Sequence, residues 1–315
     1  MPVLKWARQQ RRPHCRAVEL QTDSAQALFP LSFVPFFSLS QPMTSKFGLV
    51  VVGDEILSGK RVDKHLGKVI ELLAARGLAL SYADYVGDDP ERLTATLQRA
   101  AASSDIVFCT GGIGATPDDQ TRQSAARALG VPLVLHPEAK ALIQERIADV
   151  AREQGEPCEP ERPDNLHRLN MGTFPEGAGI IPNPFNKIPG FSCQGPGGSA
   201  LYFTPGFPVM AWPMIEWVLE QHCAHLFHQA PQTEHSVLVF GAMEAALTPL
   251  MERIEKNHAQ VRVFSLPTVN HPVHGSHIEL GVKGPSDAVP AAWDELIASL
   301  HQDGAKCGPE VVRQW

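Results

Sequence analysis

The sequence predicts an α/β protein with a three-layer α/β/α domain around a mostly parallel sheet, followed by a small α+β domain. From Phe47 onward, short apolar segments alternate with amphipathic segments, the pattern of strands joined by crossover helices. A glycine-rich turn over residues 110–121 follows one apolar segment and precedes a helical one. Near the C-terminus the expected order is strand, helix, two strands and helix, which indicates a separate small unit.

The first half of the three-layer domain is expected to run β-α-β-α-β, which favours a parallel sheet with helices on both faces. Asp63 is placed to cap the first helix, and the pair Asp89-Pro90 is placed to begin the second. The expected strands are 49–52, 80–86 and 106–109, and the expected helices are 63–77, 90–101, 120–129 and 138–152.

The second half is dense in glycine and proline. Residues 155–165 are expected to form a surface loop, and residues 172–208 to contain short extended pieces at 179–181 and 201–203. A helix over 209–220 then leads to a boundary near residues 229–233. The small unit is expected to contain strands 235–240, 260–266 and 277–282 and helices 244–256 and 288–300.

Residues 1–42 differ from the rest of the chain. They carry five basic residues against two acidic ones, and their apolar run is broken by Pro30 and Pro35. No clear small-residue cleavage site precedes Met43, so a disordered arm or a start codon assigned too early is favoured over a signal peptide. The expected domains are therefore 1–42, 43–230 and 231–315.

The composition excludes several functional classes. A net charge of −7 provides no basic footprint for nucleic acid. No apolar run reaches membrane-spanning length, so no membrane association is expected. The six cysteines show no CxxC spacing, which suits reduced thiols and a cytoplasmic location.

The most informative segment is the glycine-rich turn, which includes Thr110, Gly111, Gly112, Gly114, Thr116, Asp118, Asp119 and Thr121. Such a turn between a strand and a helix presents backbone N–H groups to an anion. Its two adjacent carboxylates can hold a divalent cation beside a phosphate. The alternative is a plain helix start, in which Asp119 only complements the helix dipole.

The pattern TGG-x-G-x-T-x-D-D-x-T resembles the signature loop of the MoaB/Mog molybdopterin-binding fold, and its GATPDDQT version looks most like the CinA (competence/damage-inducible protein A) branch. The segment from Gly53 to Asp63 resembles the first binding loop of that family. The resemblance implies that this loop contacts the ligand through Gly53, Asp54, Glu55, Ser58 and Gly59. His65 stands where relatives typically have Asn, so it is either a ligand-tuning residue or an exposed first-turn histidine.

The resemblance also implies a pair of carboxylates that handle nucleotide phosphates and magnesium. Carried over to this chain, the pair is Asp88 and Asp119. Two carboxylates can bind one Mg²⁺ or another divalent cation, which neutralises phosphate charge and positions water. Asp89, in contrast, is expected to act only as a helix N-cap.

Two later segments resemble the family as well. The P-E-G-A segment followed by Pro182-Asn183-Pro184 makes Asn183 and Asn186 candidates for binding a base or ribose, with a structural turn as the alternative. The turn Thr204–Pro208 resembles the family's P-G-x-P turn, in which Pro205 and Gly206 approach the ligand. The three histidines His271, His274 and His277 have metal-like spacing but are expected to be structural or exposed.

For function, the resemblance implies a metal-dependent pyrophosphatase that acts on an ADP-ribose-like nucleotide diphosphate. A molybdopterin adenylyltransferase and a non-catalytic binder of pterin or nucleotide, with molybdopterin as a ligand, stay open as alternatives. Homo-oligomerisation is expected because family members assemble. The nicotinamide-mononucleotide deamidase domain of long CinA proteins is not expected, because the sequence ends at Trp315.

Overall fold

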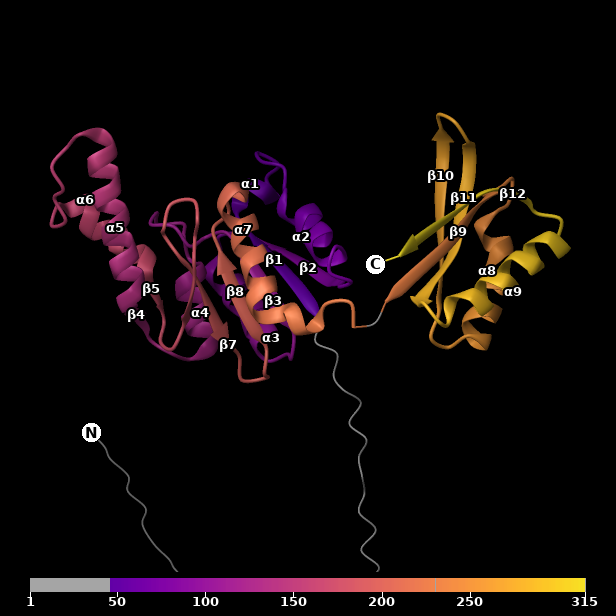
Figure 1. The fold of residues 1–315 in the computed structure, drawn as a ribbon, viewed down its shortest axis with the longest axis horizontal. Coiled ribbons are helices and arrows are strands. Elements are labelled where there is room, and N and C mark those ends of the chain that lie inside the picture. The colour runs from indigo at the N-terminus through magenta and orange to yellow at the C-terminus, as the bar shows by residue number, and fades with distance from the viewer. Residues whose placement is uncertain (1–45, 230, 315) are drawn as a thin grey trace, which may run out of the picture. The chain divides into compact units, whose positions relative to one another are not determined.

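The computed structural model describes residues 46–229 and 231–314. The predicted arm at residues 1–42 and the alternative start at Met43 lie outside these residues. The described chain contains a six-stranded sheet with flanking helices and, after residue 231, a four-stranded sheet with two helices (Figure 1).

The six-stranded sheet has the order β2-β1-β3-β8-β7-β6. Its first four strands pair in parallel, and the last two continue the sheet antiparallel. The predicted mostly parallel sheet is therefore confirmed. The strands are β1 (Phe47–Val52), β2 (Leu80–Val86), β3 (Ile106–Thr110), β6 (Gly179–Ile181), β7 (Gly190–Gln194) and β8 (Ala200–Thr204).

Helices cover both faces of this sheet, as predicted. Helices α2 and α7 pack on one face, and α3 and α4 pack on the other (Figure 1). The helices are α1 (Asp54–Leu57), α2 (His65–Ala74), α3 (Pro90–Ala101), α4 (Thr121–Leu129), α5 (Pro137–Gln154), α6 (Pro163–Arg168) and α7 (Pro208–Val218), with short helical turns η1 (Leu169–Gly172), η2 (Leu219–Cys223) and η3 (Ala224–Leu226).

Alternation along β1 explains the two cores. Val50 and Val52 belong to the cluster with α3, whereas Leu49 and Val51 belong to the cluster with α2 and α7. All six β1 residues are buried, as expected for a central parallel strand. The sheet is thus fixed from both sides, and the loops at its carboxyl-terminal edge start from rigid positions.

Short elements in the second half were missed. Strands β4 (Leu133–Leu135) and β5 (Thr173–Pro175) pair with each other, and three residues are too few for a periodic pattern to show. The predicted loop over 155–165 is wrong at its end, because α6 begins at Pro163. Proline suits the first position of a helix, so this residue marks a start and not a break.

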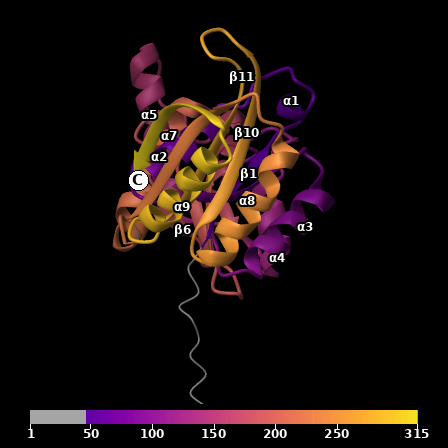
Figure 2. The same cartoon turned by 90° about the vertical axis from the view of Figure 1, so that its right-hand side faces the viewer.

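The part after residue 231 is an antiparallel sheet of order β10-β11-β9-β12 with α8 and α9 packed against it (Figure 2). Strand β12 was not predicted, because its sequence is mostly polar and exposed. The elements are β9 (Gln232–Phe240), α8 (Glu244–Asn257), β10 (Arg262–His271), β11 (Gly275–Pro285), α9 (Val289–Gln302) and β12 (Lys306–Gln314).

Within residues 46–229 and 231–314, none of the helices combines the length and the apolar character needed to cross a bilayer.

Candidate functional site

A cavity of 520 Å³ lies where the parallel strands end. Its walls are the segments that follow β1, β2, β3 and β8, together with residues 183–189, so it occupies the usual ligand position of such sheets. Thirteen residues predicted from the sequence line it: Gly53, Glu55, Asp88, Gly111, Gly112, Gly114, Thr116, Asp118, Asp119, Asn183, Asn186, Pro205 and Gly206.

The other predicted residues lie outside this lining. Ser58 and Gly59 are exposed after α1, and Thr121 is buried beneath the glycine turn. His65 and Thr110 line a neighbouring cavity of 410 Å³, which shares Val52, Glu55, Arg61 and Gly206 with the first. The remaining residue, Asp54, contacts Asp88.

Residues 110–121, here called the glycine loop, run between β3 and α4. Gly111 has φ 103°, and a Cβ there would lie 2.3 Å from the carbonyl oxygen of Val52. A Cβ on Gly114 would lie 2.5 Å from a carboxylate oxygen of Asp119. Position 111 therefore requires glycine, and a side chain at position 114 would displace the Asp119 carboxylate.

The carbonyl groups of the glycine loop are tied to residues behind it. Thr121 donates its N–H to the carbonyl of Gly112 at 2.9 Å and its hydroxyl to the carbonyl of Gly111 at 2.8 Å. Arg122 donates to the carbonyl of Gly114 at 2.5 Å, and His167 Nε2 donates to the carbonyl of Ala115 at 2.8 Å. Four carbonyl oxygens of one loop are thus held in place.

Several backbone N–H groups of the same loop, unlike its carbonyls, are without partners among the described residues. In a planar trans peptide, the N–H points opposite to the preceding carbonyl. The N–H groups of Gly112, Ile113 and Ala115 therefore point away from Thr121, Arg122 and His167. Across the described residues, these three N–H groups have no hydrogen-bond partner. The loop accordingly offers several donors to a ligand in the cavity that its residues line.

Asp88 and Asp54 connect the loops that follow β2 and β1. Asp54 N–H donates to Asp88 Oδ2 at 3.0 Å, and Asp88 N–H donates to Asp54 Oδ1 at 3.2 Å. Partial burial raises the pKa of Asp88, and the nearby charges of Asp54, Glu55 and Asp118 raise this pKa further. The cavity mouth thus carries several mutually repelling carboxylates, which a bound cation would stabilise.

Asp119 is half-buried at the far end of the glycine loop. Its Oδ2 accepts hydrogen bonds from the N–H of Thr116 at 2.8 Å and from the hydroxyl of Thr116 at 2.5 Å. Its Oδ1 accepts no hydrogen bond from any described residue. The carboxylate is therefore oriented by one oxygen, which leaves the other for a ligand.

Two carboxylates of this cavity, those of Asp88 and Asp119, are of the type that a divalent cation takes as ligands. Carboxylate oxygen is the ligand that Mg²⁺ prefers, and Mg²⁺ commonly binds through one or two carboxylates with water and substrate phosphate completing its shell. Across residues 46–229 and 231–314, no group of three or more His, Cys, Asp or Glu side chains is arranged to hold a metal. Asp88 and Asp119 would thus supply only part of the coordination.

The wall formed by residues 183–189 differs from the glycine loop. Asn183 Nδ2 donates to Asn186 Oδ1 at 2.8 Å and to the carbonyl of Ile188 at 2.9 Å, and its Oδ1 accepts the N–H of Phe185 at 3.0 Å. Asn186 Oδ1 also accepts the N–H of Ile188 at 3.0 Å. The Asn183 amide is therefore used within its own loop, as the alternative of a structural turn requires.

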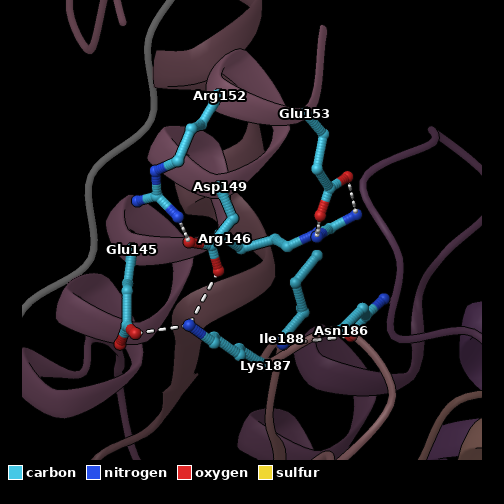
Figure 3. Close-up of polar contacts among 8 residues, drawn as sticks. All are labelled: Glu145, Arg146, Asp149, Arg152, Glu153, Asn186, Lys187 and Ile188. Carbon is cyan, nitrogen blue, oxygen red and sulfur yellow. Dashed lines mark hydrogen bonds and ion pairs between the residues drawn. The ribbon is translucent and has the colours of Figure 1, made fainter.

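Lys187 fastens this loop to α5 (Figure 3). Its backbone has φ 65°, an unusual value for a residue other than glycine. Its ammonium group contacts Glu145 and lies 2.7 Å from Asp149, which also accepts from Arg152 at 3.0 Å. These ion pairs hold the backbone of residues 183–189 from outside the cavity.

His65 links the first loop to the turn after β8. It is the first residue of α2 and is 4% exposed, so the alternative of an exposed histidine is wrong. Its Nε2 lies 3.0 Å from the carbonyl oxygen of Gly206, which accepts only, so Nε2 carries the proton. Its Nδ1 is buried with no partner among the described residues.

Sequence reasoning missed Arg122, His167 and the rim pair Arg61–Phe207, whose cation and ring centroid are 5.9 Å apart. The helical spacing from Arg122 to the buried Ala125 and Ala126 places the arginine on the buried face, so a signal existed. No sequence signal marks His167, because it belongs to a separate segment that folds back against the loop.

The three spaced histidines lie at the β10–β11 hairpin. The His271 and His274 rings have centroids 5.1 Å apart, and His277 lies 5.5 Å and 6.0 Å from them. His271 Nδ1 accepts the N–H groups of Val273 and His274, which is a turn-stabilising role. Among the described residues they form no metal-binding group.

Residues 48–225 match the protein family described as "Probable molybdopterin binding domain". The match covers more than half of the chain. It includes the six-stranded sheet from the second residue of β1 onward and every loop of the cavity.

Individual proteins also resemble this chain. A protein of Pyrobaculum calidifontis is 29% identical over 255 residues, which cover 79% of this chain and 93% of that protein. A CinA-like protein of Gloeobacter violaceus is 35% identical over 160 residues, covering 51% of this chain and 35% of the relative. The crystal structure of CinA, of unknown function, from Thermoplasma acidophilum is 26% identical, with a TM-score of 0.48, and the match covers 56% of this chain and 98% of that structure.

Proposed function

The chain belongs to the molybdopterin-binding domain family, and we propose that it hydrolyses the pyrophosphate bond of an ADP-ribose-like nucleotide with the help of a divalent cation. One observation carries the proposal: unpartnered amides of the glycine loop and the carboxylates Asp88 and Asp119 line the same cavity. Its similarity to CinA-like proteins supports the proposal. The chain spans less than half the length of those relatives, so we do not assign to it the activity of the whole relatives.

The glycine loop would bind the diphosphate. The N–H groups of Gly112, Ile113 and Ala115 lie beside the N-terminus of α4, and both features favour an anion. Because the carbonyls of the loop are fixed from behind, these donors need no rearrangement to meet developing charge on phosphate oxygens. The cavity volume of 520 Å³ lies within the usual range of small-molecule and cofactor sites.

Hydrolysis requires water to attack one phosphorus atom. A new P–O bond forms, the bond between that phosphorus and the bridging oxygen breaks, and the water loses a proton. The products are AMP and ribose 5-phosphate when the substrate is ADP-ribose. A bound Mg²⁺ supplies charge neutralisation and a template for phosphate and water. Asp88 and Asp119 would hold the cation, and the proton released by the attacking water would pass to solvent.

The test is incubation of purified protein with ADP-ribose, FAD, and ATP plus molybdopterin, each with and without Mg²⁺. Product analysis by chromatography should show AMP and ribose 5-phosphate from ADP-ribose only when the cation is present. Binding of ADP-ribose without hydrolysis under every condition would favour a non-catalytic binder.

A molybdopterin adenylyltransferase is the second candidate, and the family description favours it. In that reaction the pterin phosphate would attack the α-phosphorus of ATP and release pyrophosphate. The same incubation separates the two, because transfer gives adenylated molybdopterin and no ribose 5-phosphate.

A further inference from the structure

Arg122 is a buried cation behind the glycine loop. It lies in the first turn of α4 and is 4% exposed. Its guanidinium donates to the carbonyls of Gly114 and Asn170, and its Nε has no partner. No carboxylate of the described chain forms an ion pair with it.

This arrangement is costly in the free protein. A buried charge is unfavourable unless it is paired, and carbonyl dipoles compensate only part of the lost hydration. The first turn of α4 adds the positive end of the helix dipole and contains no acidic residue. Burial lowers the pKa of Arg122, and the charge of Asp119 opposes that change.

Tethering the loop does not require this charge. Thr121 holds two carbonyls of the glycine loop with neutral donors. His167 holds the Ala115 carbonyl through Nε2, and its Nδ1 lies 3.3 Å from the amide nitrogen of Asn170. Arg122 is thus the one permanently charged tether among these three residues, and its charge needs a separate explanation.

We propose that Arg122 is a specificity-determining positioning residue that makes the glycine loop select ligands bearing phosphate over neutral ligands. Its guanidinium contacts the carbonyl side of the loop, and the ligand would bind the amide side. The buried charge acts on the ligand across a single layer of backbone, where solvent screens it weakly. This inference rests on the proposed function, which places phosphate at the glycine loop.

The proposal separates charge from hydrogen bonding. Arg122→Lys keeps the charge but loses the forked geometry, whereas Arg122→Gln keeps a donor and loses the charge. Arg127→Gln is the matched control. Arg127 lies on the same helix and has no ion pair in the described chain, but it is exposed and bonds Thr94 and Ser124.

The experiment is calorimetric titration of the full chain and the three variants with AMP, adenosine and inorganic pyrophosphate, after melting curves show that each variant is folded. Arg122→Gln should weaken AMP and pyrophosphate binding by about tenfold or more and change adenosine binding less than about twofold. Arg122→Lys should stay within about threefold of the natural protein for AMP and pyrophosphate, and Arg127→Gln should change none of the three.

Equal losses for AMP and adenosine in Arg122→Gln, without rescue in Arg122→Lys, would show that Arg122 only shapes the loop and would overturn the inference. If the natural protein binds pyrophosphate but neither AMP nor adenosine, the proposal of a nucleotide substrate fails. The role of Arg122 is then decided by the pyrophosphate affinities of the natural protein and the Arg122 variants. If it binds none of the three probes, both proposals fail.

Discussion

Two walls of the cavity use their polar groups in opposite ways. The glycine loop ties its carbonyls to Thr121, Arg122 and His167 and leaves amides without partners. The wall at residues 183–189 uses the Asn183 amide to close its own turn. Lining a cavity therefore does not make a residue a ligand-binding residue. The glycine loop leaves hydrogen-bond donors without partners in the described chain, whereas the other wall uses its polar groups to keep its shape.

The largest effect on turnover is expected from a substitution in the glycine loop. Asp119→Asn keeps the side-chain shape and much of the capping of Thr116, so the free energy of unfolding should fall by at most about 1 kcal/mol. Loss of a charged cation ligand should reduce ADP-ribose hydrolysis by orders of magnitude, since each 1.4 kcal/mol of barrier is about tenfold in rate. Steady-state kinetics and a denaturant titration on one preparation measure both. Near-normal hydrolysis would remove Asp119 from the catalytic set.

Asp88→Asn should also reduce turnover strongly, but its stability should change in the other direction. The raised pKa of Asp88 means that its ionised form is disfavoured in the folded protein. Its contribution to stability is therefore largest at low pH and is lost as the pH rises through the folded-state pKa. Without cation at pH 7, Asp88→Asn should melt at the same temperature or higher. A clearly lower melting temperature would contradict the electrostatic account.

Asn183→Ala tests the opposite wall. It removes the buried amide that satisfies the Ile188 carbonyl and the Phe185 N–H, so the free energy of unfolding should fall by about 1–3 kcal/mol. The affinity for ADP-ribose should fall only to the extent that the turn at residues 183–189 is destabilised. Asn183→Asp is a useful companion, because it keeps the acceptor for Phe185. A variant of unchanged stability with abolished binding would show that Asn183 contacts the ligand directly.

Substitution of His65 should change ligand affinity less than the preceding variants do. Two substitutions distinguish the roles of its ring nitrogens. The amide nitrogen of Gln matches the Nε2 position and that of Asn matches Nδ1, so His65→Gln can keep the bond to the Gly206 carbonyl and His65→Asn cannot. His65→Asn should change ADP-ribose affinity several-fold, with His65→Gln closer to the natural protein. Titration calorimetry decides, and identical affinities in all three proteins would exclude a role for His65 in the ligand site.

The smallest effect is expected at the outer face of the second wall. Lys187→Met removes partly exposed ion pairs to Glu145 and Asp149, which contribute little to stability because solvent screens them. The melting temperature should fall slightly, and the fall should shrink at high salt, where exposed pairs are screened. A loss as large as that of Asn183→Ala would mean that the ion pairs, and not the Asn183 turn, fix this wall.

The sequence predicted most of the fold because its elements have strong local patterns. The buried runs at 49–52 and 106–109 and the capped helices at Asp63 and Asp89 all mark their own positions. Strand β12 and the pair β4–β5 could not be predicted in this way. Their residues are polar or too few, and pairing with distant strands decides their structure.

The candidate site was predicted in a similarly uneven way. The glycine loop is a contiguous segment with its own glycine and carboxylate pattern, so most of its predicted residues line the cavity. The use of the Asn183 amide within its own turn, the neighbouring cavity at His65 and the tether from His167 depend on contacts between segments far apart in the chain. Such contacts leave no trace in residue spacing.

The most direct measurement follows the amide groups of both walls during ligand binding. In a protein labelled with ¹⁵N-glycine and ¹⁵N-asparagine, addition of ADP-ribose with Ca²⁺ in place of Mg²⁺ should shift the Gly112 amide resonance saturably. The side-chain amide resonance of Asn183, already bonded within its turn, should stay near its starting position. A saturable shift at Asn183 with an unchanged Gly112 would contradict the assignment of the glycine loop as the phosphate-binding wall.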